Sequence, residues 1–180
     1  MVPRKVFPVL IIIAGTVALV GCGAGHNQNE NVSVRKAEQT PIAAGLANGP
    51  LPDSAFKASI SVASPPTKLR PGQKEILEVT VKNVSDATWP AHGRSGDGYF
   101  QVNLGNVWFD GDAKITDNPY IRSGLPNDAQ PGGVVMVPLE ITAPGKPGDY
   151  TLQIDLVQEM VAWFSEKGNN SPKFKVRVGD

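Results

Sequence analysis

The feature that most constrains the fold of this chain is a two-residue alternation of apolar and polar side chains beyond residue 55. Successive side chains of a β-strand point to opposite faces, so this period predicts strands with one apolar and one solvent-facing side. Antiparallel sheets packed face to face satisfy such a pattern. We therefore predict an all-β fold, an immunoglobulin-like antiparallel β-sandwich of about seven to eight strands in residues 55–180. The clearest alternations cover residues 56–62, 77–81, 100–104, 135–141, 151–156 and 173–178.

Turn dipeptides separate the predicted strands. Proline followed by glycine precedes three of them, at Pro71-Gly72, Pro131-Gly132 and Pro147-Gly148, and such pairs mark turns. Pro138 falls inside an alternation, which predicts an edge strand or a position whose missing amide would face solvent. Tyr150 begins another strand and resembles the tyrosine corner of immunoglobulin folds, so its hydroxyl is expected to bond to backbone upstream.

Residues 1–21 have the composition of an export signal. Arg4 and Lys5 precede an apolar run from Val6 to Val20, as the charged and apolar regions do in a secretory signal peptide. The run is about 15 residues long, which is short of the roughly 20 that a transmembrane helix needs. An uncleaved membrane helix is the alternative that this length disfavours.

The chain's single cysteine, Cys22, closes the apolar run. The stretch Leu19-Val20-Gly21-Cys22 resembles the bacterial lipobox. The resemblance implies a diacylglycerol group on the Cys22 thiol, cleavage before Cys22, and acylation of the new amine by a fatty acid such as palmitate. Two or more acyl chains anchor a protein stably, so it implies a lipoprotein of the cell envelope, with the membrane as a partner. The alternative is an ordinary signal peptide with a chance cysteine.

The residue after Cys22 bears on the membrane that would hold the anchor. By resemblance to the sorting rules of Gram-negative lipoproteins, Gly23 implies the outer membrane in a Gram-negative cell. In a cell without an outer membrane, the anchor would hold the protein on the outer face of the plasma membrane.

Residues 22–54 show no sustained apolar period and are rich in Gly, Asn, Ala and Pro. Such a segment cannot bury enough apolar surface to offset the entropy of ordering, so we predict a disordered, flexible linker.

The whole chain has 17 basic and 17 acidic residues and no formal net charge. A nucleic-acid-binding protein needs a basic face, so this balance predicts no nucleic-acid partner.

The sequence carries no motif of a known catalytic centre. It lacks a nucleophile elbow, a phosphate-binding loop and a zinc-protease motif, and two histidines, His26 and His92, are too few for a multi-histidine zinc site. Three acids of one predicted loop, Asp110, Asp112 and Asp117, are the best metal candidates, because clustered carboxylates suit calcium. Solvated turn acids are the favoured interpretation. We predict no enzyme activity and no cofactor.

Five aromatic residues are the candidate ligand-binding side chains: Trp89, Trp108, Phe109, Trp163 and Phe164. They could form a stacking platform for sugar rings, or they could belong to the core, where tryptophan is usually buried. Neighbouring residues of a strand point to opposite faces. One member of each adjacent pair could therefore be exposed.

Residues 72–168 contain a series of short motifs in a fixed order: Val79-Thr80-Val81-Lys82-Asn83, Thr88-Trp89-Pro90, Val102-Asn103-Leu104-Gly105, Trp108-Phe109-Asp110, Leu125-Pro126, Pro131-Gly132, Ala143-Pro144, Pro147-Gly148-Asp149-Tyr150, Asp155-Leu156-Val157-Gln158-Glu159 and Trp163-Phe164. Through them the stretch resembles a bacterial immunoglobulin-like module of extracytoplasmic proteins and of chains with glycosyltransferase domains. There is a weaker likeness to the four-tryptophan domains of autophagy receptors. The resemblance implies a non-catalytic sandwich and transfers no catalytic residue. Met160 departs from the glycine expected before Val-x-Trp-Phe.

These observations predict a membrane-anchored lipoprotein whose non-catalytic sandwich binds a protein or glycan partner in the cell envelope. The first alternative is a structural or assembly lipoprotein that pairs with its partner through a sheet edge. The least favoured alternative is an envelope hydrolase.

Overall fold

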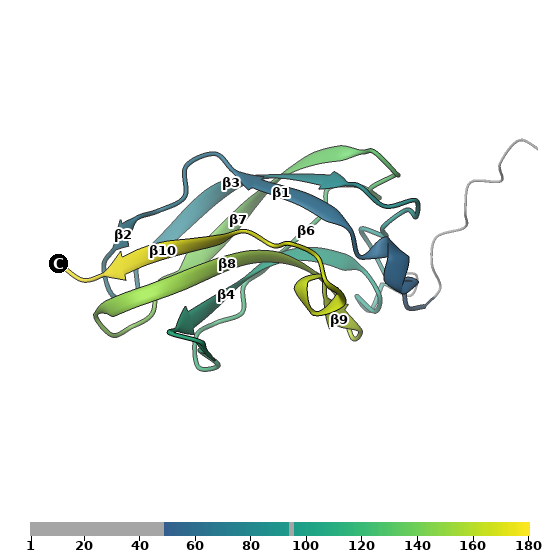
Figure 1. Ribbon diagram of the computed structural model, residues 1–180. Coiled ribbons are helices and arrows are strands. Elements are labelled where there is room, and N and C mark those ends of the chain that lie inside the picture. The colour runs from purple at the N-terminus through teal and green to yellow at the C-terminus, as the bar shows by residue number, and fades with distance from the viewer. Residues whose placement is uncertain (1–48, 94–95) are drawn as a thin grey trace, which may run out of the picture. The chain divides into compact units, whose positions relative to one another are not determined.

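The computed structural model describes residues 49–93 and 96–180, which form a sandwich of two β-sheets (Figure 1). This confirms the predicted all-β class. Within these residues no helix is long and apolar enough to span a membrane. Residues 1–21, Cys22 and the linker up to residue 48 lie outside the described part of the chain.

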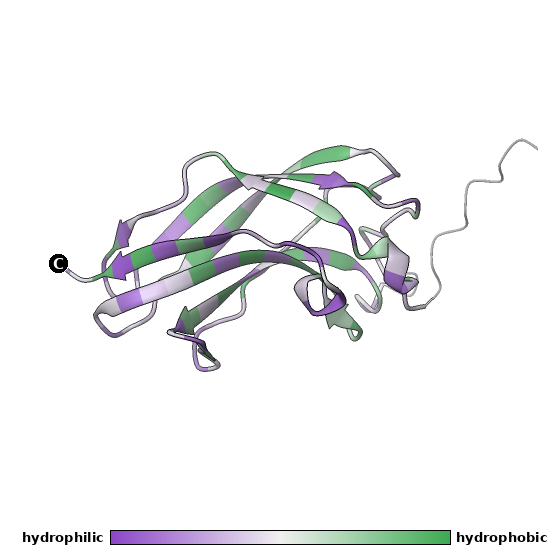
Figure 2. Cartoon of the chain, viewed as in Figure 1, coloured by the Kyte–Doolittle hydropathy of each residue, from purple (hydrophilic) through white to green (hydrophobic). Residues whose placement is uncertain are grey.

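The smaller sheet has the strand order β1-β3-β7 and is antiparallel throughout. Alternate side chains of β3 and β7 are buried against the second sheet, and the others face outward, as the alternation predicts. Figure 2 shows this alternation as changing colour along the strands. The strands are β1 (Ala58–Val62), β3 (Lys74–Asn83) and β7 (Val134–Thr142).

The larger sheet has the order β2-β10-β8-β4-β5, with β6 on β4 and β9 on β8. Its one parallel pair, β2 with β10, departs from the antiparallel prediction. The chain passes from β1 in one sheet to β2 in the other without reversing direction. The elements are β2 (Lys68–Leu69), β4 (Val102–Asp110), β5 (Ala113–Lys114), β6 (Arg122–Gly124), β8 (Gly148–Gln158), β9 (Ala162–Trp163) and β10 (Lys173–Val178), with the 3-10 turns η1 (Asp53–Ala55) and η2 (Ser165–Lys167).

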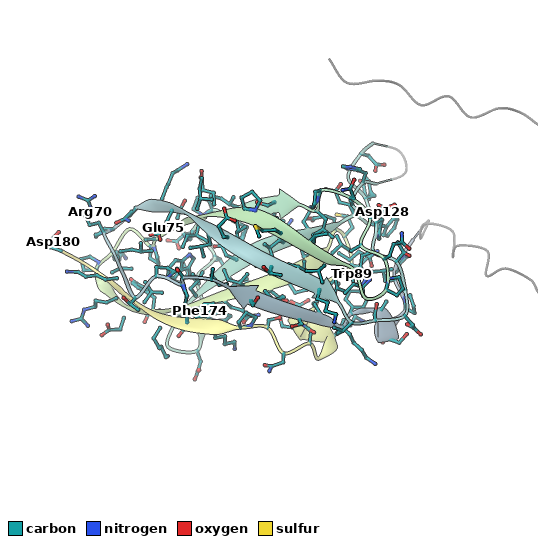
Figure 3. All side chains as sticks on the ribbon, turned by 90° about the horizontal axis from the view of Figure 1, so that it is seen from above. Arg70, Glu75, Trp89, Asp128, Phe174 and Asp180 are labelled. Atoms are coloured by element: carbon teal, nitrogen blue, oxygen red, sulfur yellow. The ribbon has the colours of Figure 1, made fainter. Side chains whose placement is uncertain are left out.

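An aromatic cluster closes one end of the core. The Phe164 ring lies 4.9 Å from the Phe56 ring and 5.1 Å from the Trp89 ring, centre to centre. The indole N–H of Trp89 donates to the Ala55 carbonyl oxygen over 2.8 Å, which satisfies this buried donor. Figure 3 shows Trp89 and Asp128 toward the same end of the domain. Residues distant in sequence are thus joined by apolar contact.

The tyrosine corner is present. The Tyr150 hydroxyl donates to the Lys146 carbonyl oxygen over 3.0 Å, and the Tyr150 ring meets Trp108 edge-on at 6.4 Å. This bond fixes the turn that leads into β8. The prediction from the position of Tyr150 is confirmed.

Pro138 lies in β7, which is an edge strand, as predicted. At the two ends of the β3–β7 ladder, Asn83 N–H donates to Gly133 and Ala143 N–H donates to Gln73. The hydrogen bonds of β7 towards β3 therefore fall on odd-numbered residues. Position 138 is even, so a proline there removes no bond of the ladder.

Two predicted boundaries differ from the structure. Phe100 was expected in a strand, but its φ is +61° and β4 begins two residues later, at Val102. Leu51 falls in the predicted linker, yet it is 5% exposed and its N–H donates to the Gln158 side chain over 2.9 Å. Packing of the sandwich therefore begins before residue 55, because an apolar residue and a backbone donor both find partners there.

The central strands of the larger sheet contradict the prediction of a solvent-facing side on every strand. Residues 102–108 of β4 and residues 152–158 of β8 are buried without interruption. Among the outward positions, Val107 and Val157 are apolar, whereas Asn103, Gln153 and Asp155 are polar. The polar side chains form hydrogen bonds to protein groups, as described below.

Candidate functional site

A return segment, residues 159–172, covers part of the outer face of β4 and β8. It contains β9 and η2, which lie on the side of the larger sheet away from β3 and β7 (Figure 1). Asp155, fully buried beneath it, accepts hydrogen bonds from the Ser165 N–H over 3.1 Å and from the Ser171 hydroxyl. Gln153 donates to the Ser165 hydroxyl over 3.0 Å. These bonds hold the segment against the sheet.

Burial is the main influence on the Asp155 carboxyl. Loss of hydration disfavours the charged form and raises the pKa of Asp155 above 3.8, and the hydrogen bonds from Ser165 and Ser171 partly oppose this rise. A raised pKa alone is no sign of catalysis. Because the side chain is fully buried and bonded to the return segment, its evident role is structural.

The return segment places Trp163 on the outer surface of β4. A Cβ atom at Gly105 would lie 3.0 Å from Cη2 and 3.1 Å from Cζ3 of Trp163, a tight contact that would require the ring to move by a few tenths of an ångström. Glycine at this strand position therefore lets the indole rest directly on the sheet. The Trp163 side chain is half-buried, with one part on the sheet and another reaching solvent.

Two cations flank the Trp163 ring. The Arg122 guanidinium lies 5.3 Å and the Lys114 ammonium 5.5 Å from a ring centre of Trp163, both within cation–π range. Lys114 also lies 5.4 Å from the ring centre of Tyr120. We call Lys114, Tyr120, Arg122 and Trp163 the Trp163 platform. They come from β5, the following loop, β6 and β9.

Glu159 borders the platform and orients its arginine. One carboxylate oxygen pairs with Arg122 at 2.7 Å, and the other accepts a hydrogen bond from the Asn103 amide over 2.8 Å. The pair is partly shielded, with side-chain exposures of 35% for Arg122 and 17% for Glu159. The arginine is thus held in place, while Lys114 is exposed and has no carboxylate within salt-bridge distance in the described residues.

The structure divides the five aromatic candidates. Trp89, Trp108 and Phe164 are at most 1% exposed and belong to the core, so they offer no surface to a ligand. Trp163 and Phe109 are half-buried on the outer face. Each adjacent pair therefore places one ring inside and one outside, as strand geometry requires.

The three acidic candidates are not brought together. In residues 49–93 and 96–180, no three ligating side chains converge as a metal site would need. Asp110 and Asp117 line one hollow, beside Tyr150, whereas Asp112 lines another, beside Phe109. The three aspartates are close in sequence, but their side chains do not converge on one metal site.

Sequence reasoning missed most of the platform. Lys114, Tyr120 and Arg122 carry no motif, and their approach to Trp163 depends on the path of two loops. One signal was available at Gly105, because a glycine inside a strand pattern often marks the close approach of another group.

No protein-family model and no curated protein matches the chain. Among solved structures, a β-glucosidase from Listeria innocua is 18% identical with a TM-score of 0.42, over 68% of this chain and 16% of that one. A CARDB domain of a Pyrococcus furiosus protein is 14% identical with a TM-score of 0.40, over 67% and 93%. A sporulation control protein from Bacillus subtilis is 15% identical with a TM-score of 0.38, over 69% and 49%.

These low identities and scores carry no conclusion about activity or ligand, and the chain spans a small part of the β-glucosidase. The class of the domain follows from its own structure. Its sheet pairing and its tyrosine corner at Tyr150 are those of an immunoglobulin-like β-sandwich.

Proposed function

We propose that this chain is a lipid-anchored protein of the cell envelope whose sandwich binds a glycan through the Trp163 platform. The carrying observation is the Trp163 indole, half-buried on Gly105 and flanked by Lys114 and Arg122. A rigid aromatic ring supplies apolar contact area at low entropic cost, and nearby polar groups supply orientation. This combination suits sugars, which have both apolar C–H faces and hydroxyl groups.

We propose a binding role rather than catalysis. The carboxylate at the platform, Glu159, is occupied by Arg122 and Asn103, and the buried Asp155 secures the return segment. A glycosidase needs two carboxyl groups on either side of a sugar bond. The pairing of these acids supports a surface that holds a ligand.

An array of envelope glycans tests the platform. The full chain in detergent should bind at least one glycan, and Trp163→Ala should weaken binding about tenfold or more, as expected when an aromatic anchor is removed. Met136→Ala is the control, because Met136 lies on the smaller sheet and is 63% exposed. If the chain binds no glycan on the array but captures an envelope protein, and Trp163→Ala abolishes that capture, the partner is a protein and not a glycan.

The lipid anchor has its own test. We expect cells fed an alkyne analogue of palmitate to label the wild-type chain and not the Cys22→Ala variant. Labelled Cys22→Ala, or an unlabelled wild type in the soluble fraction, would contradict the anchor. Fractionation would then place the labelled protein in the outer membrane of a Gram-negative host, as Gly23 implies, or on the plasma membrane.

The smaller sheet supports a second candidate function, assembly with a protein through a sheet edge. Three apolar side chains on its outer face are exposed, Ile76 by 65%, Val134 by 59% and Met136 by 63%. Two of them lie on β7, an edge strand. Exposed edges are templates for strand pairing. Met136→Lys should abolish capture of such a partner, and unchanged capture would dismiss this candidate.

A further inference from the structure

A hollow of about 350 Å³ adjoins the Trp163 platform at the end where β4 begins and β8 ends. Glu159 and Asn103 line this hollow. Glu159 pairs with Arg122 of the platform, and Asn103 donates a hydrogen bond to Glu159. Ligand pockets range from about 300 to 1,000 Å³, so this hollow suits one ring. Its lining residues are Asp97, Tyr99, Gln101, Asn103, Glu159 and Met160, with Gly98.

The backbone on both sides of the hollow is strained. Phe100 has a φ of +61° and Met160 a φ of +63°, a region that bulky residues rarely adopt. Cross-links hold both segments in place: Glu159 N–H donates to the Gln101 carbonyl oxygen over 2.9 Å, and the Gln158 amide donates to the Phe100 carbonyl oxygen over 3.0 Å. Strain that persists in a fixed frame is a feature of ligand sites.

The polar groups of the hollow are rich in acceptors. Asp97 and Glu159 contribute carboxylates, and Gln101 contributes an amide. Asn103 is 6% exposed, and its buried Oδ1 accepts no hydrogen bond from the described residues. Tyr99, 48% exposed, adds an aromatic ring. Acceptors of this kind attract hydroxyl and amide N–H donors and repel anions.

We propose that the hollow is a subsite for one uncharged sugar ring bearing hydroxyl or acetamido groups. Tyr99 provides the stacking surface, while the exposed Asp97 carboxylate and the Gln101 amide receive the donors. This inference rests on the proposed function, because the neighbouring unit of the same glycan would lie on the Trp163 platform. The platform holds exposed Lys114 and tolerates an acidic unit, whereas the hollow rejects one because its Asp97 carboxylate has no cationic partner among the described residues.

Calorimetric titration of the full chain in detergent tests the subsite. The probes are two neutral trisaccharides, chitotriose and cellotriose, and the acidic trigalacturonate. We expect a neutral probe to bind at least tenfold more tightly than trigalacturonate to the hollow. Tyr99→Ala should weaken the neutral probe about tenfold and Gln101→Ala about fivefold, as the losses of a stacking ring and of one hydrogen bond predict. Gln130→Ala, an exposed glutamine distant in sequence, is the matched control and should change nothing.

The outcomes separate the two proposals. Binding that falls with Trp163→Ala but not with Tyr99→Ala or Gln101→Ala overturns the subsite and leaves the platform. If the chain prefers trigalacturonate and Tyr99→Ala has no effect on binding, the subsite is likewise overturned and the platform remains. Binding of no saccharide, here and on the glycan array, overturns both. Because Tyr99 is 48% exposed and lies outside the core, its alanine variant should fold, and an unchanged unfolding midpoint confirms that the loss is local.

Discussion

The two sheets carry the same alternation in sequence, yet they use their outer faces differently. Outward residues of β3 and β7 meet solvent, and some of them, such as Ile76 and Met136, are apolar. Outward residues of β4 and β8 are buried beneath other protein groups, and they include the polar Asn103, Gln153 and Asp155 beside the apolar Val107 and Val157. A polar residue in a strand therefore indicates a partner for hydrogen bonds, which can be water or another segment of the chain.

The difference also separates structural from functional roles. On the larger sheet, Asp155 and Gln153 hold the return segment, and the segment in turn sets Trp163 on Gly105. On the smaller sheet, Ile76, Val134 and Met136 are not covered by any of the residues that the structure describes. The covered face therefore carries the surface that we propose for binding, and packing and hydrogen bonds fix Trp163 and Arg122 there.

The largest expected effect compares two outward acids. Asp155→Ala leaves the Ser165 N–H and the Ser171 hydroxyl without their acceptor and should lower the free energy of unfolding by about 3 kcal/mol. Glu78→Ala on the smaller sheet should change it by about 0.5 kcal/mol or less, because Glu78 is exposed. Urea unfolding of both variants gives the difference. Equal effects would contradict the distinction between the two faces.

The next effect concerns the contact beneath Trp163. Gly105→Ala adds a Cβ 3.0 Å from the indole and should cost about 1 to 2 kcal/mol while shifting tryptophan fluorescence. Gly145→Ala is the control, since a Cβ there meets nothing within 4 Å. If Gly105→Ala unfolds like the wild type with unchanged emission, Trp163 does not rest on the strand.

A pH dependence follows from the raised pKa of Asp155. The folded state holds the proton more tightly than the unfolded chain, so the contribution of Asp155 is most favourable below pH 3.8 and declines as pH rises towards its folded pKa. Asp155→Asn should remove this decline. Urea unfolding at several pH values should show the wild type losing stability relative to Asp155→Asn across that window. Parallel curves would contradict the burial of a titrating carboxyl.

A smaller effect is expected at the edge of the return segment. Met160 stands where the immunoglobulin-like resemblance expects glycine, and its φ of +63° is one that favours glycine. The turn is therefore kept with a strained residue. Met160→Gly should raise the free energy of unfolding by up to about 1 kcal/mol. Thermal unfolding measures it, with Met136→Gly, in a regular strand, expected to destabilise instead.

Much of the fold followed from local patterns, and most of the site did not. The alternation located β3 and β7 because their outward residues do face water. The position of Tyr150 at the start of a strand predicted the turn before β8. Strands of two residues, such as β2 and β9, are too short to show an alternation of apolar and polar side chains. The platform depends on Lys114 of β5 and Arg122 of β6 reaching Trp163 of β9. Such long-range encounters are set by the packing of the sheets, which a linear pattern does not contain.

Hydroxyl-radical footprinting tests most directly which outer face binds. The full chain would be oxidised with and without solubilised envelope glycans, and modification read residue by residue. We predict that Tyr99, Tyr120 and Trp163 become protected while Met136 and Ile76 react as before. Protection of Met136 and Ile76 with unchanged Tyr99, Tyr120 and Trp163 would contradict it and move the binding surface to the smaller sheet.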